Sequence, residues 1–275
     1  MLEVPSPIIL ALKCGTETMK NDLIRTIESR AFRAWPALEV GDHAGWLLRA
    51  SSGYTKRANS ANAFSPGTYQ AHELIAAVEQ FYGERRQAAV FRLTPLADAR
   101  LDDILHAAGY TFLEPSLVMQ ASLENAACAP EGTDDIVLRT GFDPAWSAAF
   151  AEATGMGEAD HLIHDRMLAA ITPTAVFATI ESTDAPGRPH AFALAVADDG
   201  MVGIFDVLVD EQMRRRGLGR KLVQALMTWG KTQGAHSAYL QVGGHNHEAI
   251  SLYQQLGFRT VYPYHYRRKT LPAST

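Results

Sequence analysis

Three arginines followed by two closely spaced glycines form the segment of this sequence with the clearest chemical potential. The segment reads Arg214, Arg215, Arg216, Gly217, Leu218, Gly219 and Arg220. It follows an apolar strand candidate and opens an amphipathic helix, whose first backbone N–H groups have no partner inside the helix. Such N–H groups and the helix dipole attract anions, glycines allow a close approach, and arginines add charge-assisted hydrogen bonds. The segment therefore predicts an anion-binding loop, and a solvated basic turn is the alternative.

The loop matches neither of two common nucleotide motifs. No Gly-Lys-Ser/Thr run follows, as a Walker loop requires, and Leu222 stands where a dinucleotide fingerprint has its third glycine. The chain carries a net charge of -5, so its basic residues are local clusters in an acidic protein. This distribution favours a small anionic ligand over a polyanion, and no nucleic-acid partner is expected.

Asp206 is the second residue of interest, because it is the only acid in an apolar strand candidate at 202–209. An acid buried without a partner costs free energy, so a functional reason for it is expected. It would bind an amine or remove a proton from it. An acid exposed at a strand edge is the alternative.

The elements that position these residues form an α/β pattern, in which helices alternate with short apolar strands. Helices are expected near 16–35, around 74–81, up to Gly109, near 144–154 and 158–171, from Gly217, and up to Gly257. Strands are expected at 45–50, 56–64, 89–94, 111–119, 135–139, 175–181, 190–197, 202–209, 237–242 and 259–266. The three strands from 175 to 209 form an antiparallel meander, with turn residues at 184–187 and 198–200.

A weak internal repeat relates the two halves at an offset of 148 residues. Positions 74–110 align without a gap to 222–258, and Gly109-Tyr110 falls on Gly257-Phe258. Glycine at a helix end has a physical role, so this match means more than the apolar matches around it. The repeat predicts two tandem domains of one fold, at 1–125 and 132–275. The Ala-, Pro- and Gly-containing stretch 124–134 would be the linker between them.

The second half resembles the GNAT superfamily of N-acetyltransferases over residues 132–269. Arg214-x-x-Gly217-x-Gly219 after a meander is similar to the pyrophosphate loop of that family. Residues 239–242 resemble its fifth strand. The helix that follows matches its Asn-x-x-Ala-x-x-Leu-Tyr-x-x-x-Gly-Phe pattern at Asn246, Ala249, Leu252, Tyr253, Gly257 and Phe258. The resemblance implies a mixed, mostly antiparallel sheet flanked by helices, and acetyl-CoA as the acetyl donor.

The same resemblance implies roles for individual residues. The backbone of Val207, Leu208 and Val209 would pair with the pantetheine arm, and the 214–220 loop would hold the diphosphate. Asn246 would hydrogen-bond the cofactor. Tyr253 would act as general acid toward the leaving thiolate, which is chemically reasonable for a phenol. A core aromatic on an amphipathic helix is the alternative for Tyr253.

The first half lacks these features. The positions that correspond to 214–219 are occupied by residues 66–71, which include no arginine, and both loop glycines are replaced. Asp98 falls on Asn246 and Leu105 falls on Tyr253. We therefore expect the first half to bind no cofactor. It would instead form a wall of the acceptor site, with the polar segment 53–60 as a candidate contact, or replace a dimer partner.

The remaining residues limit the class of protein. Cys14 and Cys128 fit no metal or redox spacing, and His245 with His247 lacks a third ligand, so no metal is expected. No signal peptide or membrane span is expected, which predicts a cytoplasmic protein. The acceptor would be a small-molecule or peptide amine, and a monomer is favoured over a homodimer. A non-catalytic acyl-CoA-binding module is the alternative function.

Overall fold

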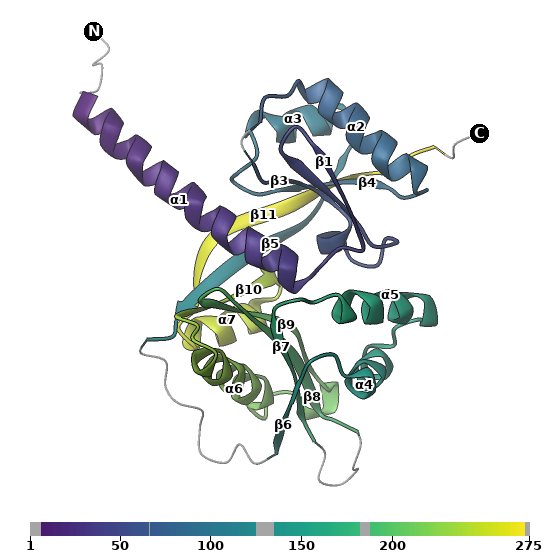
Figure 1. Cartoon of the computed structure of the whole chain (residues 1–275), viewed down its shortest axis with the longest axis vertical. Helices are drawn as coiled ribbons and strands as arrows, with labels where there is room; N and C mark the ends of the chain where they lie inside the picture. Colours follow the sequence, from purple (N-terminus) through teal and green to yellow (C-terminus); the bar gives the residue numbers. More distant parts are fainter. Residues whose placement is uncertain (1–6, 66, 125–134, 182–187, 273–275) are drawn as a thin grey trace.

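The computed structural model describes residues 7–65, 67–124, 135–181 and 188–272 (Figure 1). The first half contains α1 (Pro7–Ala34), β1 (Glu39–His43), β2 (Trp46–Ala50), η1 (Lys56–Ala58), β3 (Ala61–Ala63), α2 (Ala71–Glu84), β4 (Ala89–Leu93), α3 (Arg100–Ala107) and β5 (Thr111–Ser122). The second half contains β6 (Ile136–Thr140), α4 (Pro144–Thr154), α5 (Glu158–Ala169), β7 (Thr174–Ile180), β8 (Ala191–Asp198), β9 (Met201–Val209), η2 (Glu211–Met213), α6 (Leu218–Thr232), β10 (Ser237–Gly243), α7 (His247–Gln255) and β11 (Arg259–Lys269). The α/β class with a mixed sheet is confirmed.

The internal repeat is visible in the element bounds. An offset of 148 residues carries α2 onto α6, β4 onto β10, α3 onto α7 and β5 onto β11, each to within a few residues. Gly109 and Gly257 both have positive φ, 85° and 91°, just after the helices α3 and α7. Both glycines therefore stop a helix in the left-handed conformation that favours this residue.

All the strands join one 11-stranded sheet, in the order β1-β2-β3-β4-β11-β5-β10-β9-β8-β7-β6. The order shows a reciprocal strand exchange between the halves. β5 of the first half pairs antiparallel with β10 of the second, while β11 of the second half pairs antiparallel with β4 of the first. β5 and β11 also pair with each other along their length. In Figure 1 these two long strands run side by side from one half to the other. The halves therefore share backbone hydrogen bonds at their junction.

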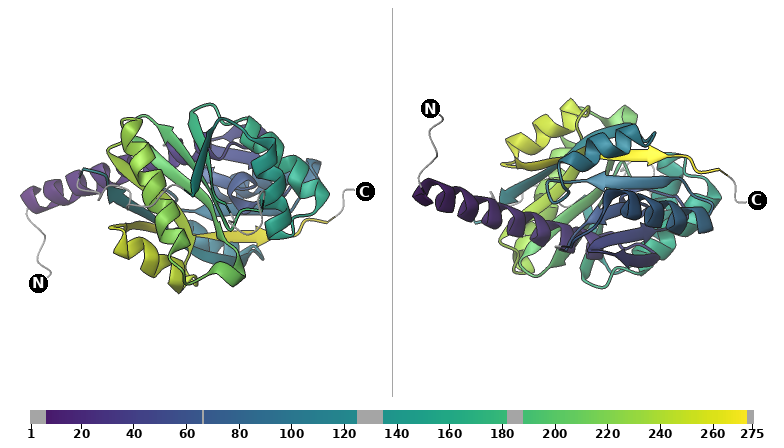
Figure 2. Two further views of the ribbon diagram at one scale, coloured as in Figure 1. Left: turned by 90° about the horizontal axis from the view of Figure 1, so that it is seen from below. Right: turned by 90° about the horizontal axis from the view of Figure 1, so that it is seen from above.

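Helices cover both faces of the sheet. Side chains alternate along a strand, so consecutive residues face opposite layers. On β8, Phe192 and Leu194 join a core with α1, α4 and α5, whereas Ala193 and Ala195 join a core with α6 and α7. A third core lies under α2 and α3 in the first half. Figure 2 shows that the N-terminal part of α1 projects beyond this layered body.

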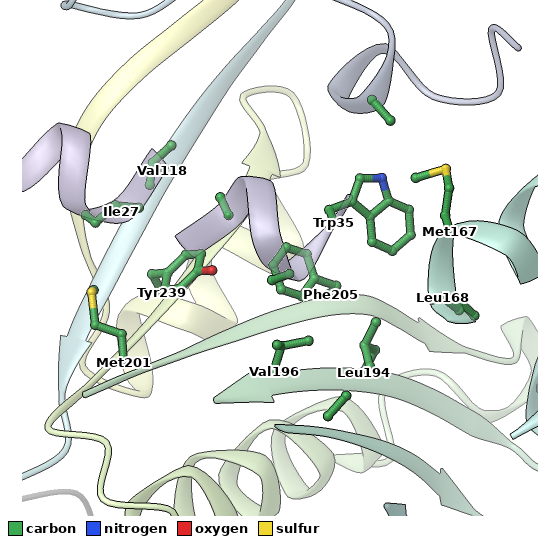
Figure 3. Packing of buried hydrophobic residues seen from close by; sticks show 14 of the residues in the cluster. Ile27, Trp35, Val118, Met167, Leu168, Leu194, Val196, Met201, Phe205 and Tyr239 are labelled. Atoms are coloured by element: carbon green, nitrogen blue, oxygen red, sulfur yellow. The ribbon is translucent and has the colours of Figure 1, made fainter. Parts of the chain in front are cut away.

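The end of α1 is anchored at the centre of the molecule. Trp35 stacks on Phe205 of β9, with ring centroids 6.0 Å apart. Figure 3 shows Trp35 between Phe205 and Met167 of α5, so an element of the first half fills the core of the second. Trp35 is only 2% exposed. The core on this face therefore depends on both halves.

A buried ion pair of the first half contacts an exchanged strand of the second half. Glu28 of α1 accepts two hydrogen bonds from Arg92 of β4, one of them at 3.0 Å. Tyr262 of β11 donates to the same carboxylate, and the Arg92 guanidinium lies 3.9 Å from the Tyr264 ring centroid. Both charged side chains are only 2% exposed. Because a buried charge is costly without its partner, this pair fixes α1 against the exchanged strands.

Two predicted elements differ from those observed, and one observed strand was not predicted. The expected strand 56–64 is wrong over 56–58, which form η1, and only Ala61–Ala63 is a strand. Asn59 explains the difference, because its side chain accepts from the backbone N–H groups of Ser51 and Gly53 and closes a compact loop. The first helix begins at Pro7 rather than near Thr16. The strand β1 was not predicted, since it is a largely exposed polar edge strand. The predicted linker 124–134, except for Glu124, and the predicted turn at 184–187 lie outside the described residues.

Candidate active site

A cavity of about 1110 Å³ lies where the parallel strands β9 and β10 separate. The two strands pair from Met201 opposite Ser237 to Ile204 opposite Leu240, and their pairing ends there. Val207, Leu208 and Val209 line the cavity beyond this point. β9 therefore presents an edge to the cavity that no strand of the sheet covers, and backbone N–H and C=O groups on such an edge can pair with an extended ligand.

Asp206 marks the place where β9 turns away from β10. Its φ is +49°, and the pairing with β8 shifts so that two residues of β9 stand opposite Ala193. This is a β-bulge, which bends a strand and redirects its side chains. A positive φ is uncommon at a non-glycine residue, and strained backbone of this kind clusters at functional sites. The bulge places Asp206 in the cavity lining.

The 214–220 loop forms one wall of the cavity. Gly217 has φ +80° and directly precedes α6, so the chain enters the helix through a left-handed residue. In the described chain, no hydrogen bond is donated by the backbone N–H groups of residues 215–220. These groups are free to bind an anion, as the loop was predicted to do.

Three of the four loop arginines line the cavity, namely Arg214, Arg215 and Arg220, whereas Arg216 does not. Arg215 pairs with Glu248 at 2.9 Å, and Arg220 donates to Gln255. The Arg215 and Glu248 side chains are mostly exposed, so their ion pair contributes little stability. Both arginines can exchange these partners for a phosphate at low cost.

Asn246 and Tyr253 lie on α7, at the opposite wall. The Asn246 side-chain oxygen caps α7 by accepting from the Ala249 N–H at 3.1 Å. Its amide N–H groups make no hydrogen bond to a described residue, so they remain available to a ligand. Tyr253 is 7% exposed, and burial raises the pKa of its phenol to about 12. Tyr253 lines the cavity, and its hydroxyl makes no hydrogen bond to a described residue. The phenol is therefore a proton donor at neutral pH.

His164 of α5 is a site residue that the sequence reasoning missed. Its Nε2 lies 3.2 Å from Oδ2 of Asp206, and its side chain is fully buried. Only 11% of the Asp206 side chain is exposed, so the alternative of a solvent-exposed acid does not describe it. A lone histidine on an amphipathic helix carries no signal in one sequence, because its partner is 42 residues away.

The first half also reaches this site. Arg57 lines the cavity and forms no ion pair with any residue that the structure describes. Its guanidinium lies 5.2 Å from the Trp35 ring centroid. Tyr54 packs on His164, with ring centroids 5.5 Å apart. Burial, followed by the nearby Asp206 carboxylate, raises the pKa of Tyr54 above its usual value. Two side chains of the predicted contact segment 53–60 thus lie at or beside the cavity.

The corresponding place in the first half is smaller and differently built. Its hollow is about 350 Å³ and includes Trp46, Tyr69 and Asp98. Tyr69 packs edge-on against Trp46, and Asp98 is paired with Arg100 at 2.7 Å. A Cβ at Gly67 would stand 2.1 Å from the Ala44 carbonyl oxygen, so the loop lies directly on the β1–β2 turn. This hollow offers no cationic loop and no phenol in place of Tyr253.

Comparison with known proteins agrees with this geometry. Residues 22–268 match the family described as "Probable histone acetyltransferase Rv0428c C-terminal". The chain belongs to this family of GNAT acetyltransferases. A relative from Bacillus subtilis, "Uncharacterized N-acetyltransferase YobR", is 29% identical over 256 residues, covering 90% of this chain and 99% of the relative.

Solved structures share the fold of this GNAT chain. A GCN5-related N-acetyltransferase from Kribbella flavida has a TM-score of 0.66 at 17% identity, and the alignment covers 90% of this chain and 96% of the Kribbella chain. A tandem GNAT protein from the clavulanic acid biosynthesis pathway has a TM-score of 0.61 at 13% identity, with coverage of 78% and 76%. The recognition of a GNAT acetyltransferase from two sequence motifs is thereby confirmed.

Two further observations concern the described residues alone. No helix in them is long and apolar enough to cross a membrane. Nor do they contain a group of three or more histidine, cysteine, aspartate or glutamate side chains placed to hold a metal ion.

Proposed function

We propose that this GNAT acetyltransferase moves the acetyl group of acetyl-CoA to an amine, in one direct step within the β9–β10 cavity. One observation carries the proposal: a single cavity joins an uncovered strand edge, a loop of free N–H groups and a protonated phenol. A long ligand with an amide-containing arm and a diphosphate uses all three features.

The proposed binding mode follows from the groups that are free. Val207, Leu208 and Val209 pair with the pantetheine amides, as an added strand would. Backbone N–H groups of the 214–220 loop bind the diphosphate, and Arg214, Arg215 and Arg220 add charge-assisted contacts. The Asn246 amide donates to the pantetheine arm. Arg216 lies outside the cavity lining, so its part is limited to long-range attraction of the anion.

The proposed reaction uses one acid and one base. The amine nitrogen attacks the thioester carbonyl carbon, the carbon–sulfur bond breaks, and the thiolate takes the Tyr253 hydroxyl proton. Asp206 holds the incoming amine and accepts the proton that the nitrogen loses. The burial that raises the pKa of Tyr253 also makes a thiolate in the same cavity more basic, so the proton transfer stays favourable.

The acceptor site is proposed to lie between the halves, beside Asp206, with Arg57 and Tyr54 from the first half. The first half itself is proposed to bind no acetyl-CoA, because its hollow is small and lacks a free cationic loop. One chain supplies both walls, so a monomer suffices. Light scattering on the purified protein tests this last point.

Isothermal titration of acetyl-CoA tests the binding site. We expect one site per chain for the wild type and no binding for Gly217→Glu. The matched control is Gly234→Glu, because Gly234 has φ +81°, is free of neighbours within 4 Å and lies outside the cavity lining. It carries the same charge and the same backbone strain. Two sites per chain would refute the proposal that the first half binds no acetyl-CoA. Equal losses of affinity in Gly217→Glu and Gly234→Glu would refute the loop as the diphosphate site.

A panel of four amines then tests catalysis: a free α-amino acid, spermidine, a peptide with a free N-terminal amine and an N-terminally blocked peptide with an internal lysine. CoA release is the readout. Turnover of any member excludes the non-catalytic acyl-CoA-binding alternative. Binding without any turnover would favour that alternative.

A further inference from the structure

The pair formed by His164 and Asp206 is more elaborate than an ordinary core contact. The His164 ring is closed in by Trp35, Tyr54 and Phe150, with ring centroids 5.5 to 5.8 Å away. Its Nε2 meets Asp206, while its Nδ1 is buried without any hydrogen-bond partner among the described atoms. One nitrogen is thus used and the other is left unsatisfied.

The surroundings determine which form of the ring is held there. An ionised Asp206 can only accept a hydrogen bond, so the ring carries a proton on Nε2 and donates it to Oδ2. Asp206 lines the cavity, and the hydrogen bond to His164 involves Oδ2, which leaves Oδ1 available to a ligand.

A purely structural role does not explain this arrangement. A leucine of similar size would fill the aromatic box and would leave no polar nitrogen unsatisfied, which is the cheaper way to build a core. Buried polar groups kept at such a cost are expected at functional sites. The backbone of Asp206 is unfavourable as well, with its positive φ. Each member of the pair therefore carries a cost in free energy, an unsatisfied nitrogen in His164 and an unfavourable backbone conformation in Asp206.

We infer that His164 is a positioning residue for the acetyl-transfer reaction, which fixes the Asp206 carboxylate so that Oδ1 faces the acceptor amine. The inference rests on the proposed function. The Nε2–H hydrogen bond occupies Oδ2 and leaves Oδ1 to accept the proton lost by the amine. Nε2–H also stops the carboxylate from rotating away from the cavity. His164 itself neither touches the substrate nor gains or loses a proton in this scheme.

Two substitutions test the inference. His164→Leu removes the donor and fills the space, whereas His164→Gln keeps a side-chain N–H near the position of Nε2. The amine used is the member of the four-amine panel that the wild type acetylates fastest. Acetyl-CoA affinity, thermal midpoint and kcat/KM for the amine are measured for all three proteins. All variants retain Tyr54, whose ring packs on His164, and the charged side chains of Arg57 and Asp160 near Tyr54.

We expect His164→Leu to lower kcat/KM for the amine by about tenfold, which is less than the 10²- to 10⁴-fold contribution of a full general base. The loss falls on kcat/KM for the amine and not on acetyl-CoA affinity, because the carboxylate is still present but is no longer held in one orientation. The thermal midpoint and acetyl-CoA affinity stay at wild-type values, and His164→Gln recovers most of the activity.

Other outcomes overturn the inference. If His164→Leu keeps the wild-type kcat/KM for the amine, His164 has no positioning role. If both variants lose stability and acetyl-CoA affinity along with activity, the histidine is a structural residue. A wild type that binds acetyl-CoA but acetylates no amine of the panel would instead refute the proposed function, and the inference with it.

Discussion

Replacing Tyr253 by phenylalanine is the sharpest test of the proposed chemistry, because it removes one oxygen atom from the cavity. The ring packs on Phe258 with centroids 5.9 Å apart and is 7% exposed, and phenylalanine keeps this packing. The hydroxyl makes no hydrogen bond to a described residue, so its loss leaves no stranded partner. We therefore expect an unchanged fold and an unchanged affinity for acetyl-CoA.

The effect on the rate follows from the role assigned to the hydroxyl. General acid catalysis contributes about 10²- to 10⁴-fold. The loss in kcat corresponds to about 3 to 5 kcal/mol of transition-state stabilisation. Because the pKa of Tyr253 is raised to about 12, the wild-type phenol stays protonated up to about pH 11. The tyrosine therefore adds no alkaline limb near pH 10, where an ordinary phenol would ionise.

The assay is steady-state CoA release across pH 6 to 10, with acetyl-CoA affinity measured by titration. Tyr110→Phe is the control, since it removes a phenol hydroxyl from the first half, where it donates to Glu79 outside the cavity. A Tyr253→Phe variant that keeps more than half of the wild-type kcat would refute the acid role. Loss of acetyl-CoA binding in that variant would show that the hydroxyl serves binding instead.

Three further predictions concern the junction of the halves. Glu28→Gln leaves the buried Arg92 without its counter-charge and is expected to lower the free energy of unfolding by about 3 to 5 kcal/mol. The control, Asp22→Asn, breaks an exposed ion pair on the same helix and is expected to cost about 1 kcal/mol at most. Urea denaturation of both variants compares the two losses. The Arg267 hydrogen bonds lower the pKa of Asp102 to about 2, so its stabilisation is present above pH 4 and lost as the pH falls toward 2. The free energy of unfolding is measured from pH 7 to pH 2 for the wild type and for Asp102→Asn. The variant should be less stable at pH 7 and should lose less stability below pH 4. Parallel stability curves for the two proteins would refute a stabilising role for the Asp102 carboxylate. A fragment of residues 132–275 lacks β5, so one edge of β10 is unpaired. We therefore expect this fragment to show no acetyl-CoA binding by titration unless residues 1–125 are co-expressed. Binding by the fragment alone would refute the need for the strand exchange.

Much of the second half could be predicted from the sequence, because its signals are local. The helix at 144–154 has the expected bounds, and the three meander strands lie within a residue or two of theirs. Gly217 was predicted to open a helix at an anion loop, and it does precede α6 with positive φ. Periodicity, glycines and the order of motifs act over a few residues, and they are therefore readable in one chain. The edge strand β1 has no such signal, since three of its five residues are polar and its one apolar side chain, Val40, is exposed.

The tertiary structure alone decided how the halves combine and which side chains meet. The sequence determined the repeat, the family resemblance and the candidates Tyr253, Asn246 and Asp206. It did not reveal that β5 and β11 cross between the halves, because apolar strands of similar pattern can pair with either neighbour. Nor did it reveal His164 beside Asp206, or Arg57 in the cavity lining. Local spacing determines secondary structure, whereas contacts between residues 42 or more than 100 positions apart are set by which surfaces bury one another when the chain folds.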